Sequence, residues 1–425
     1  MARPPAWSYG GRICAVTKGQ TRQVTGTVLA LQGVDNSGRQ PAKEYGAMNP
    51  KRILVTGGAG FIGSHLVDAL VSQGHAVRVL DNLDPQVHGA ATGPASIAGH
   101  VDSGTVEFIH GDVRDASIVA SALDGIDLVT HQAAAVGVGQ SMYRIADYVR
   151  ANCEGTGVLL QAITERDRPL ERLVVASSMS IYGEGQYRCD EHGTVHPPLR
   201  PEDQLRDGVW EMLCPVCGTT LNPEPTSETK PLAPTSVYAV SKRDQEELCL
   251  SVGGAYGIPT VSLRYFNVYG PRQSLDNPYT GVAAIFTCRL LNERPPLVFE
   301  DGAQSRDFVH VSDIVRDNVL AMEPGRGDGE AINIATGRSL GLRELITALR
   351  AKLGGPEPEY VGRFRKGDIR HCFGDATKAR DLLGFEASVQ FEDGIDDLAA
   401  WADGQDAVDR IDEARRELEA AGLTV

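Results

Sequence analysis

Residues 52–81, RILVTGGAGFIGSHLVDALVSQGHAVRVLD, decide the fold of this chain. The segment 52–56 is a β-branched apolar run, typical of a strand that is buried on both faces. A glycine-rich turn follows at 57–63, then apolar residues at helical spacing to residue 73, and a second strand at 76–80. The order of strand, glycine loop, helix and strand predicts the first half of a dinucleotide-binding fold.

Each glycine of the loop has its own physical role. Gly57 permits the tight turn, Gly60 lets the backbone approach a pyrophosphate, and Gly63 permits close contact between helix and strand. Free N–H groups and the positive end of the helix attract the pyrophosphate. Asp81, 18 residues after Gly63, is placed to bind the adenosine ribose hydroxyls, which favours NAD over NADP. Glycine loops often only turn a chain, but the complete order within 30 residues favours a cofactor loop.

The alternation of strands and helices continues along the chain. Strands are expected at 106–109, 128–131 and 173–176, and a long helix at 143–164. Asp112 and Val113, directly after the third strand, are placed to contact adenine. The pattern predicts an α/β fold, a doubly wound Rossmann sheet that is parallel and covered by helices on both faces. Ligands then bind at the carboxyl ends of the strands.

Composition excludes several classes of protein. Of the 425 residues 42% are hydrophobic, which is ample for a core, yet no run approaches the ~18 apolar residues of a membrane span. The net charge of −15 disfavours binding to nucleic acid or to an anionic membrane. Eight scattered cysteines do not make a secreted disulfide scaffold. We expect a globular cytoplasmic protein that binds neither nucleic acid nor a membrane.

The chain divides into four expected parts. Residues 1–47 carry six Lys or Arg against two Asp or Glu and no periodicity, and we interpret them as a disordered extension, with a transit peptide as the alternative. Residues 48–265 form the NAD-binding part, which contains an insertion at 184–235. Residues 266–402 form a smaller α/β substrate lobe interleaved with the first part. The acidic end, 403–425, is expected to form a solvated terminal helix.

Three residues form a candidate catalytic group. Ser178 ends a strand, and Tyr238 and Lys242 are four apart and share one face of a predicted helix. A lysine beside a phenol lowers the phenol pKa from its usual ~10, which suits proton transfer at neutral pH. The hydroxyl of Ser178 is placed to hydrogen-bond the substrate oxygen. The plainer alternative is a half-buried tyrosine beside a lysine that extends to solvent.

From about Met48 to Trp401 the chain resembles the extended short-chain dehydrogenase/reductase family, specifically its nucleotide-sugar epimerases and dehydratases. The resemblance rests on these motifs, which follow one another in the family's order: GGAGFIG, HQAA at 131–134, ANCEGT at 151–156, SSMSIYG at 177–183, YAVSK at 238–242, RYFNVYGPRQ at 264–273 and SRDFVHVSDI at 305–314. It implies that Tyr238 accepts the proton of the sugar hydroxyl, that Lys242 holds the nicotinamide ribose, and that Ser178 binds the reacting oxygen.

The resemblance also implies the remaining site residues. Asn267 and Arg306 would hold the substrate diphosphate, Asp368 the nucleotide ribose, and Val298 would line the substrate pocket. An arginine is a bidentate donor suited to phosphate. Loop and resemblance together predict this cofactor site: Gly57, Gly60, Phe61, Ile62, Gly63, Asp81, Asn82, Asp112, Val113, Ala133, Asn152, Tyr238, Lys242 and Tyr265. A homodimer through the helices at 143–164 and 236–252 is expected from the family.

The reaction depends on two positions after Ser178. Family members open by oxidising sugar C4, and the dehydratases then use an Asp-Glu pair that directly follows the strand-end hydroxyl residue; the decarboxylases keep the Glu. Met179 and Ser180 occupy these positions here and cannot do that work. We therefore predict C4 epimerisation through a 4-keto sugar, with NAD retained and recycled. The alternatives are a UDP-hexose or UDP-uronic acid 4-epimerase, a 4,6-dehydratase, and an NAD-binding regulatory protein without catalysis.

The insertion carries a second motif. Cys189-x-x-His192 is followed by Cys214-Pro-Val-Cys217-Gly, two half-sites whose spacing predicts a closed, structural zinc site. Chance cysteines or a redox pair at Cys214 and Cys217 are the alternatives. A similar cysteine-bearing insertion occurs in members of the family that resemble the dTDP-L-rhamnose 4-epimerases. That resemblance makes dTDP-L-rhamnose the leading substrate and dTDP-6-deoxy-L-talose the product.

Overall fold

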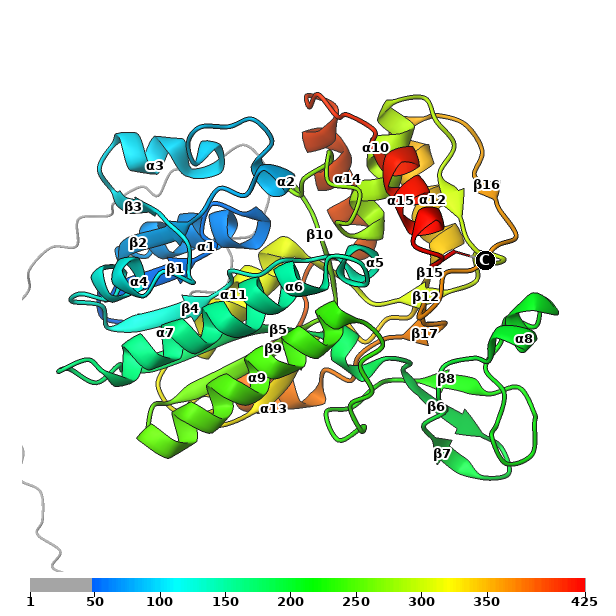
Figure 1. The fold of residues 1–425 in the computed structure, drawn as a ribbon, viewed down its shortest axis with the longest axis horizontal. Helices are drawn as coiled ribbons and strands as arrows, with labels where there is room; N and C mark the ends of the chain where they lie inside the picture. The colour runs from blue at the N-terminus through cyan, green and yellow to red at the C-terminus, as the bar shows by residue number, and fades with distance from the viewer. Residues whose placement is uncertain (1–47, 425) are drawn as a thin grey trace, which may run out of the picture. The chain divides into compact units, whose positions relative to one another are not determined.

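The strand at the start of the glycine loop, β1 (Arg52–Thr56), lies inside a seven-stranded sheet of order β14-β9-β5-β4-β1-β2-β3. The structure is a computed structural model that describes residues 48–424, so the expectation for 1–47 lies outside the described residues. Every pairing in this sheet is parallel, which confirms the predicted doubly wound sheet (Figure 1). The other six strands are β2 (Ala76–Asp81), β3 (Val106–His110), β4 (Leu128–His131), β5 (Arg172–Ser178), β9 (Thr260–Tyr265) and β14 (Ala331–Ile334).

Helices cover both faces of the sheet, as a parallel sheet requires. On one face lie α4 (Ala116–Ala122), α7 (Gly155–Thr164) and α9 (Val237–Tyr256), packed side by side (Figure 1). On the other face α1 (Phe61–Ser72) packs against α11 (Val311–Met322). All residues of β5 are buried, which explains why its apolar residues at 173–176 follow one another without alternation.

The helix predicted at 143–164 begins at Ile145 and contains a π-helical segment. It consists of α6 (Ile145–Tyr148), a π-helical segment η2 (Val149–Glu154), and α7. Single π-helical turns often occur at functional sites. This segment contains Asn152, whose side chain forms hydrogen bonds with Ala135 and Ser241, in two other parts of the chain. These bonds give the helix a reason to depart from regular α-helical geometry here.

The substrate lobe is built from short strands and three helices. Its strands are β10 (Asn267–Tyr269), β11 (Leu297–Val298), β12 (Ser305–Arg306), β13 (Phe308–His310), β15 (Leu340–Gly341), β16 (Glu359–Tyr360) and β17 (His371–Cys372). The helices α10 (Val282–Leu291), α12 (Leu342–Leu353) and α14 (Phe391–Ala402) enclose a separate apolar core around Phe286, Leu345 and Ile395. In the chain, α11 and β14 lie between the lobe strands β13 and β15, yet they belong to the large sheet and its helical layer. Lobe and sheet are therefore interleaved.

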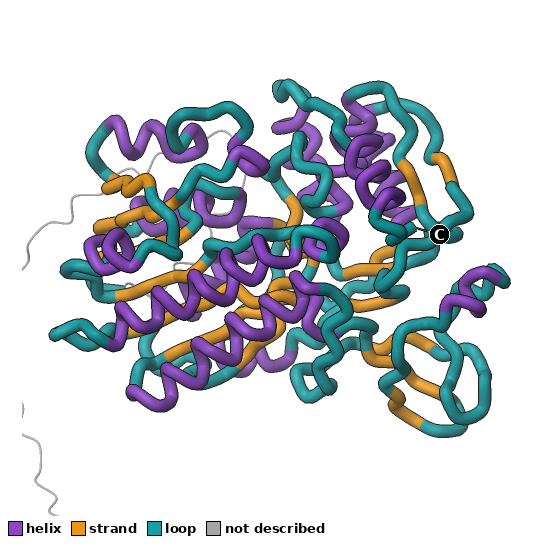
Figure 2. Tube along the Cα trace, in the orientation of Figure 1, coloured by secondary structure: helices purple, strands orange, loops and turns teal. Residues whose placement is uncertain are grey.

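The insertion forms a lobe of its own. Three antiparallel strands in the order β7-β6-β8 make its sheet: β6 (Gln186–Cys189), β7 (Gly193–Val195) and β8 (Asn222–Glu224). Long loops and the short helix α8 (Glu202–Arg206) complete it (Figure 2). Its apolar core contains only five buried residues, among them two of the cysteines.

The C-terminal segment differs from the solvated helix expected at 403–425. Its helix, α15 (Ile411–Ala420), begins only after a loop in which Asp409 is ion-paired with Arg289 and Arg294. Ala414 and Leu418 are buried, so this amphipathic helix packs on the protein with one face. Within residues 48–424 no helix is both long enough and apolar enough to cross a membrane.

Candidate functional site

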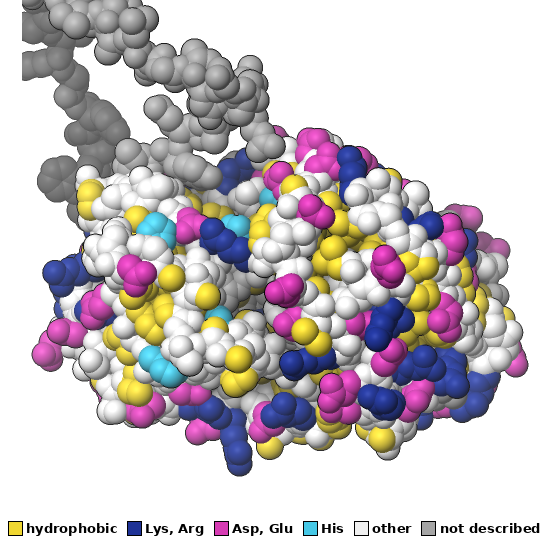
Figure 3. All heavy atoms as spheres, turned by 90° about the horizontal axis from the view of Figure 1, so that it is seen from above, with side chains coloured by type: hydrophobic (Ala, Val, Ile, Leu, Met, Phe, Trp, Pro, Cys, Tyr) yellow, Lys and Arg dark blue, Asp and Glu magenta, His cyan; other side chains and the backbone are white. Residues whose placement is uncertain are grey.

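A groove of about 1190 Å³ runs along the carboxyl ends of β1, β2, β4 and β5 and continues into the substrate lobe. Figure 3 shows the molecule from the side on which its surface is hollowed between these two parts. This is the edge at which open α/β sheets bind their ligands. The expected catalytic, cofactor and substrate residues line the groove, with the exception of Asn152.

The glycine loop has the geometry that its sequence predicts. Gly57 has φ +69°, and a Cβ atom there would lie 2.8 Å from the amide nitrogen of Ala133. A Cβ atom at Gly63 would collide with the carbonyl oxygen of Gly57. Gly60 caps α1, whose first-turn N–H groups have no acceptor within the helix and line the groove at Phe61 and Ile62. These free donors and the helix dipole fit a pyrophosphate.

Asp81 at the end of β2 has a structural role besides the expected one. One carboxylate oxygen accepts from the amide of Ala59, 3.0 Å away, and the other from the amide of Leu83 at 2.9 Å. The carboxylate therefore fixes the glycine loop against the end of β2. The carboxylate lines the groove, and each oxygen has a further lone pair for a ribose hydroxyl.

Asp112 is held in its ionised form at the adenine end of the groove. Arg114 donates to it at 2.6 Å and Asn82 at 3.1 Å. The hydrogen bond from Arg114 lowers the pKa of Asp112 to about 2. Asp112 and Val113 both line the groove, at the end where the sequence predicts that adenine binds.

Ser178, Tyr238 and Lys242 meet where β5 ends and α9 begins. Burial is the larger effect and raises the pKa of Tyr238, although a hydrogen bond with Ser178 partly opposes this rise. Lys242 donates to the carbonyl oxygen of Ala176 and, at 2.7 Å, to Oε1 of Gln245. Burial lowers the pKa of Lys242 to about 8. The group that lowers the Tyr238 pKa is thus Ser178, and not Lys242 as its helical spacing predicts, because the ammonium group points to the end of β5.

Asn152 does not line the groove but fixes a segment that does. Its Oδ1 accepts from the amide of Ala135 at 2.7 Å, and its Nδ2 donates to Oγ of Ser241 at 2.8 Å. The fully buried amide therefore joins the loop after β4 to the helix that carries Tyr238. Nearby His131 is buried between Thr56 and Thr156, and burial lowers its pKa to about 3, so it is a neutral structural histidine.

The substrate lobe brings four expected residues to the other end of the groove, namely Asn267, Val298, Arg306 and Asp368. The Oδ1 atom of Asn267 is buried and has no hydrogen-bond partner within the described part of the chain. A ligand that donates a hydrogen bond would satisfy this atom. Arg306 donates to the carbonyl oxygens of Ile369 and Arg370 at 2.8 and 2.9 Å, which fixes its guanidinium at the groove.

The positions after Ser178 carry no acid. Met179 is buried, Ser180 donates to Oγ of Ser178 at 2.8 Å, and both line the groove. Neither side chain is an acid or base that could protonate or deprotonate sugar C5 or C6.

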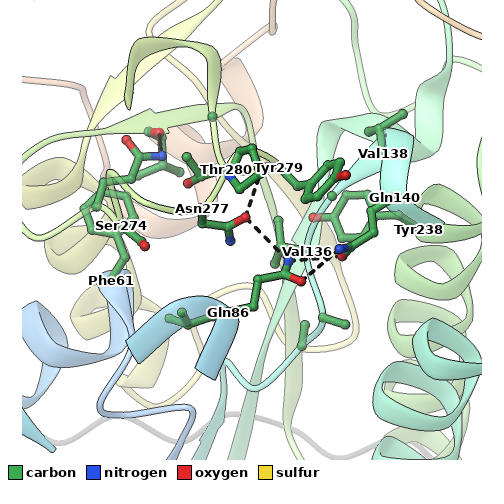
Figure 4. A pocket seen from close by; sticks show the side chains of 18 of the residues that line it. Phe61, Gln86, Val136, Val138, Gln140, Tyr238, Ser274, Asn277, Tyr279 and Thr280 are labelled. Atoms are coloured by element: carbon green, nitrogen blue, oxygen red, sulfur yellow. Dashed lines mark hydrogen bonds between the residues drawn. The ribbon is translucent and has the colours of Figure 1, made fainter. Parts of the chain in front are cut away.

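Sequence reasoning missed the amide groups at the centre of the groove. Gln86 of α2 (Pro85–His88), Gln140 of α5 (Val138–Ser141) and Asn277 point toward one another (Figure 4). Their hydrogen bonds span 54 and 191 positions of the chain, so no local pattern could have revealed them.

Sequence reasoning also missed the C-terminal contribution. Tyr143 and Tyr279 both donate to Glu417 of α15 at 2.7 Å. Ala414 and Leu418 line the groove beside them. The end of the chain therefore forms part of the groove wall.

The insertion brings its four predicted ligands together. Donor atoms of Cys189, His192, Cys214 and Cys217 all lie within 4.8 Å of one another. The Cys189 sulfur is 3.6 Å from that of Cys217 and 3.4 Å from Nδ1 of His192, and the Cys214 sulfur is 3.7 Å from the same nitrogen. Four ligands at ~2.3 Å around one tetrahedral zinc ion would be separated by about 3.5–3.8 Å.

A buried ion cluster joins the insertion to the substrate lobe. Arg370, with a fully buried side chain, contacts Glu211 of the insertion at 2.5 Å and Glu300 of the lobe at 3.0 Å. Arg200 of the insertion pairs with Glu300 at 2.8 Å. The carbonyl oxygen of Arg370 also accepts from Arg306. The insertion is therefore linked to a groove residue through one intermediate side chain.

Known proteins share this architecture over most of the chain. The sequence matches the family described as "NAD dependent epimerase/dehydratase family" over residues 53–204 and 215–335. It is 35% identical to a dTDP-L-rhamnose 4-epimerase of Burkholderia thailandensis over 83% of this chain and 94% of that protein. It is 30% identical to a putative UDP-glucose 4-epimerase of Methanocaldococcus jannaschii, with 82% and 97% covered.

Solved structures of similar proteins have the same fold as this chain. The UDP-glucose 4-epimerase of Thermotoga maritima, solved with UDP-glucose, has a TM-score of 0.66 at 31% identity and covers 82% of this chain and 98% of that one. The UDP-glucose 4-epimerase of Thermus thermophilus, solved as a complex with NAD, has a TM-score of 0.65 at 31% identity, with 84% and 100% covered. The chain therefore belongs to the NAD-dependent nucleotide-sugar epimerase/dehydratase family of extended short-chain dehydrogenases/reductases.

Proposed function

We propose that the protein inverts C4 of a nucleotide-diphosphate sugar through a 4-keto intermediate and recycles its NAD in each turnover. The observation that carries the proposal is the groove end at which Ser178 and Tyr238 lie together while Met179 and Ser180 supply no acid. NAD would accept the hydride from C4 and later return it to the other face of the sugar. Gly57, Gly60 and Asp81 would hold the cofactor there.

The residues of the chain account for the proton steps. The phenolate of Tyr238 takes the proton of the C4 hydroxyl as the C–H bond breaks, and it returns the proton when the ketone is reduced. Ser178 donates a hydrogen bond to the reacting oxygen in both directions. Lys242 lies beneath them, and its lowered pKa of about 8 allows it to gain or lose a proton near neutrality.

The leading substrate is dTDP-L-rhamnose, converted to dTDP-6-deoxy-L-talose. Support comes from the relative in Burkholderia thailandensis and from the cysteine-bearing insertion. The rival substrates are UDP-hexoses or UDP-uronic acids, since several similar proteins are named UDP-glucose 4-epimerases. Diphosphate contacts from Asn267 and Arg306, and a ribose contact from Asp368, would serve either class.

Product analysis of a substrate panel tests the proposal. The protein is incubated without added NAD with dTDP-L-rhamnose, UDP-glucose, UDP-glucuronic acid and dTDP-glucose, and products are identified by NMR. A C4-inverted sugar is expected. A 4-keto-6-deoxy product would establish dehydratase activity, the activity named for two of the relatives. Absence of turnover with NAD bound would instead favour an NAD-binding regulatory protein.

We also infer a structural zinc ion in the insertion, bound by Cys189, His192, Cys214 and Cys217. Their donor atoms have tetrahedral spacing, and the turn at Cys214 is fixed by a bond from its amide to the carbonyl oxygen of Thr219 at 2.8 Å. All four positions are filled by protein ligands, so the ion would hold the lobe together without taking part in catalysis. A core of five buried residues is too small to stabilise such a lobe alone.

Finally, we propose a homodimer through η2, α7 and α9. Ile145, Val149, Val240 and Leu248 are exposed apolar residues on these helices or on the adjoining α6. An apolar set of this kind on adjacent helices fits a second copy of the chain. Light scattering after gel filtration is expected to give twice the chain mass, and a monomer would contradict the proposal.

A further inference from the structure

We propose that Gln86, Gln140 and Asn277 form a clasp over the cofactor groove that slows release of NAD. This inference rests on the proposed function, because it takes NAD to occupy the groove. The clasp consists of a reciprocal amide pair: Gln86 Nε2 donates to Oε1 of Gln140 at 3.0 Å, and Gln140 Nε2 donates to Oε1 of Gln86 at 2.8 Å. Gln86 also donates to Oδ1 of Asn277 at 3.4 Å.

Sheet topology places this pair above the glycine loop. In the sheet β1 lies directly between β4 and β2. Gln86 belongs to the segment after β2 and Gln140 to the segment after β4, so the two amides come from the loops on either side of the loop that follows β1. A pyrophosphate bound at Gly57–Gly63 would therefore lie beneath the bond between them. All these segments line the same groove.

The three side chains are held in place for this contact. Gln140 is buried, and its Oε1 also accepts from the hydroxyl of Tyr148 at 3.0 Å. Gln86 is held through its backbone. Asp84, the N-cap of α2, accepts a hydrogen bond from the backbone N–H of Gln86 at 2.8 Å. Asn277 is buried and accepts from the amide of Tyr279 at 3.0 Å.

Release of NAD would need this bridge to open. Both amide hydrogen bonds must break before the segments after β2 and β4 can separate. The bond to Asn277 connects the bridge to the substrate lobe, so the lobe contributes to closure. An enzyme that regenerates its cofactor in each turnover gains from such retention, whereas one that exchanges its cofactor would be slowed by it.

Exchange of labelled NAD tests the clasp. The protein is saturated with NAD that carries a radiolabel in its adenine ring and is diluted into excess unlabelled NAD, and the label that remains bound is followed by filtration. Gln86→Ala is expected to release NAD about 10-fold to 30-fold faster than the wild type, because it removes the two neutral hydrogen bonds with Gln140 and the longer one to Asn277. Gln390→Ala, at the exposed N-cap of α14, is the matched control and should release NAD at the wild-type rate.

A double mutant separates a clasp from two independent contacts. If the amides act as one bridge, Gln86→Ala/Gln140→Ala releases NAD within about threefold of the faster single variant. Effects that multiply, or a release rate for Gln86→Ala within twofold of the wild type, would overturn the proposal. Because Gln86 is only half-buried, Gln86→Ala decides the question even if Gln140→Ala does not fold.

The clasp and the proposed function fail in different ways. Turnover of a nucleotide sugar without added NAD is measured on the same wild-type preparation. Turnover together with unchanged NAD release in Gln86→Ala overturns the clasp alone. No turnover on any sugar of the panel overturns the proposed function, and faster NAD release in Gln86→Ala would still support the clasp.

Discussion

Replacing Glu211 by glutamine should weaken the joint between the insertion and the substrate lobe. Glu211 accepts from Arg370 at 2.5 Å and from Nε2 of His371 at 3.1 Å. The hydrogen bond from His371, followed by that from Arg370, lowers the pKa of Glu211 from its usual 4.5 to about 2. The carboxylate therefore stabilises the folded protein, and its uncharged isostere should not.

The magnitude follows from the pKa. A change from 4.5 to about 2 corresponds to about 3 kcal/mol at neutral pH. The Glu211 side chain is 40% exposed, so solvent screening reduces the expected loss to about 1–2 kcal/mol. Because the folded-state pKa is lowered, this stabilisation is complete above pH 4.5 and disappears as the pH falls toward 2. The difference between wild type and Glu211→Gln should shrink over the same range.

Urea denaturation at pH 7 and at pH 3 measures both effects. Glu357→Gln is the control, since Glu357 forms an exposed pair with Arg350 on α12 that should contribute less than about 0.5 kcal/mol. Glu211→Gln should also weaken binding of dTDP, because Arg370 presents the carbonyl oxygen that holds Arg306. Equal stability of Glu211→Gln and wild type at pH 7 would refute this reasoning.

Three further results are expected. Tyr238→Phe should lower turnover by about 10²–10⁴-fold with unchanged NAD content, because the general base is lost while the cofactor loop is intact; turnover near that of the wild type would contradict the mechanism. Purified protein should contain about one zinc per chain by mass spectrometry of metals, and Cys217→Ser should lower this content; less than half an equivalent in the wild type would contradict the metal site. Deletion of 403–425 should raise KM for the nucleotide sugar with little change in bound NAD, because Ala414 and Leu418 leave the groove wall; an unchanged KM would show that α15 is not needed there.

The sequence predicts the cofactor half of the site well because its signals are local. The turn at Gly57, the contact at Gly63 and the acid at Asp81 lie within 30 residues, and each has a backbone or charge requirement that few other residues meet. The cysteine cluster was also predictable, since two short half-sites set its geometry.

The missed features depend on tertiary contacts. Helical spacing places Lys242 beside Tyr238, but the ammonium group instead bonds to the carbonyl oxygen of Ala176, which only the packing of α9 on β5 brings near. The helix expected at 143–164 contains a π-helical turn because Asn152 bonds to segments 17 and 89 positions away. The clasp and the packing of α15 on the groove have the same origin. No local pattern encodes a contact between segments that meet only in the folded chain.

Transfer of deuterium within one sugar tests the central claim most directly. The protein is incubated without added NAD with dTDP-L-rhamnose that carries deuterium at C4, and the product is examined by NMR. Hydride removal and return by the same retained NAD predicts dTDP-6-deoxy-L-talose with the deuterium still at the inverted C4. A C4-inverted product that has lost its deuterium to solvent or to free NAD would contradict recycling of a bound cofactor, and a product with unchanged C4 configuration would contradict epimerisation.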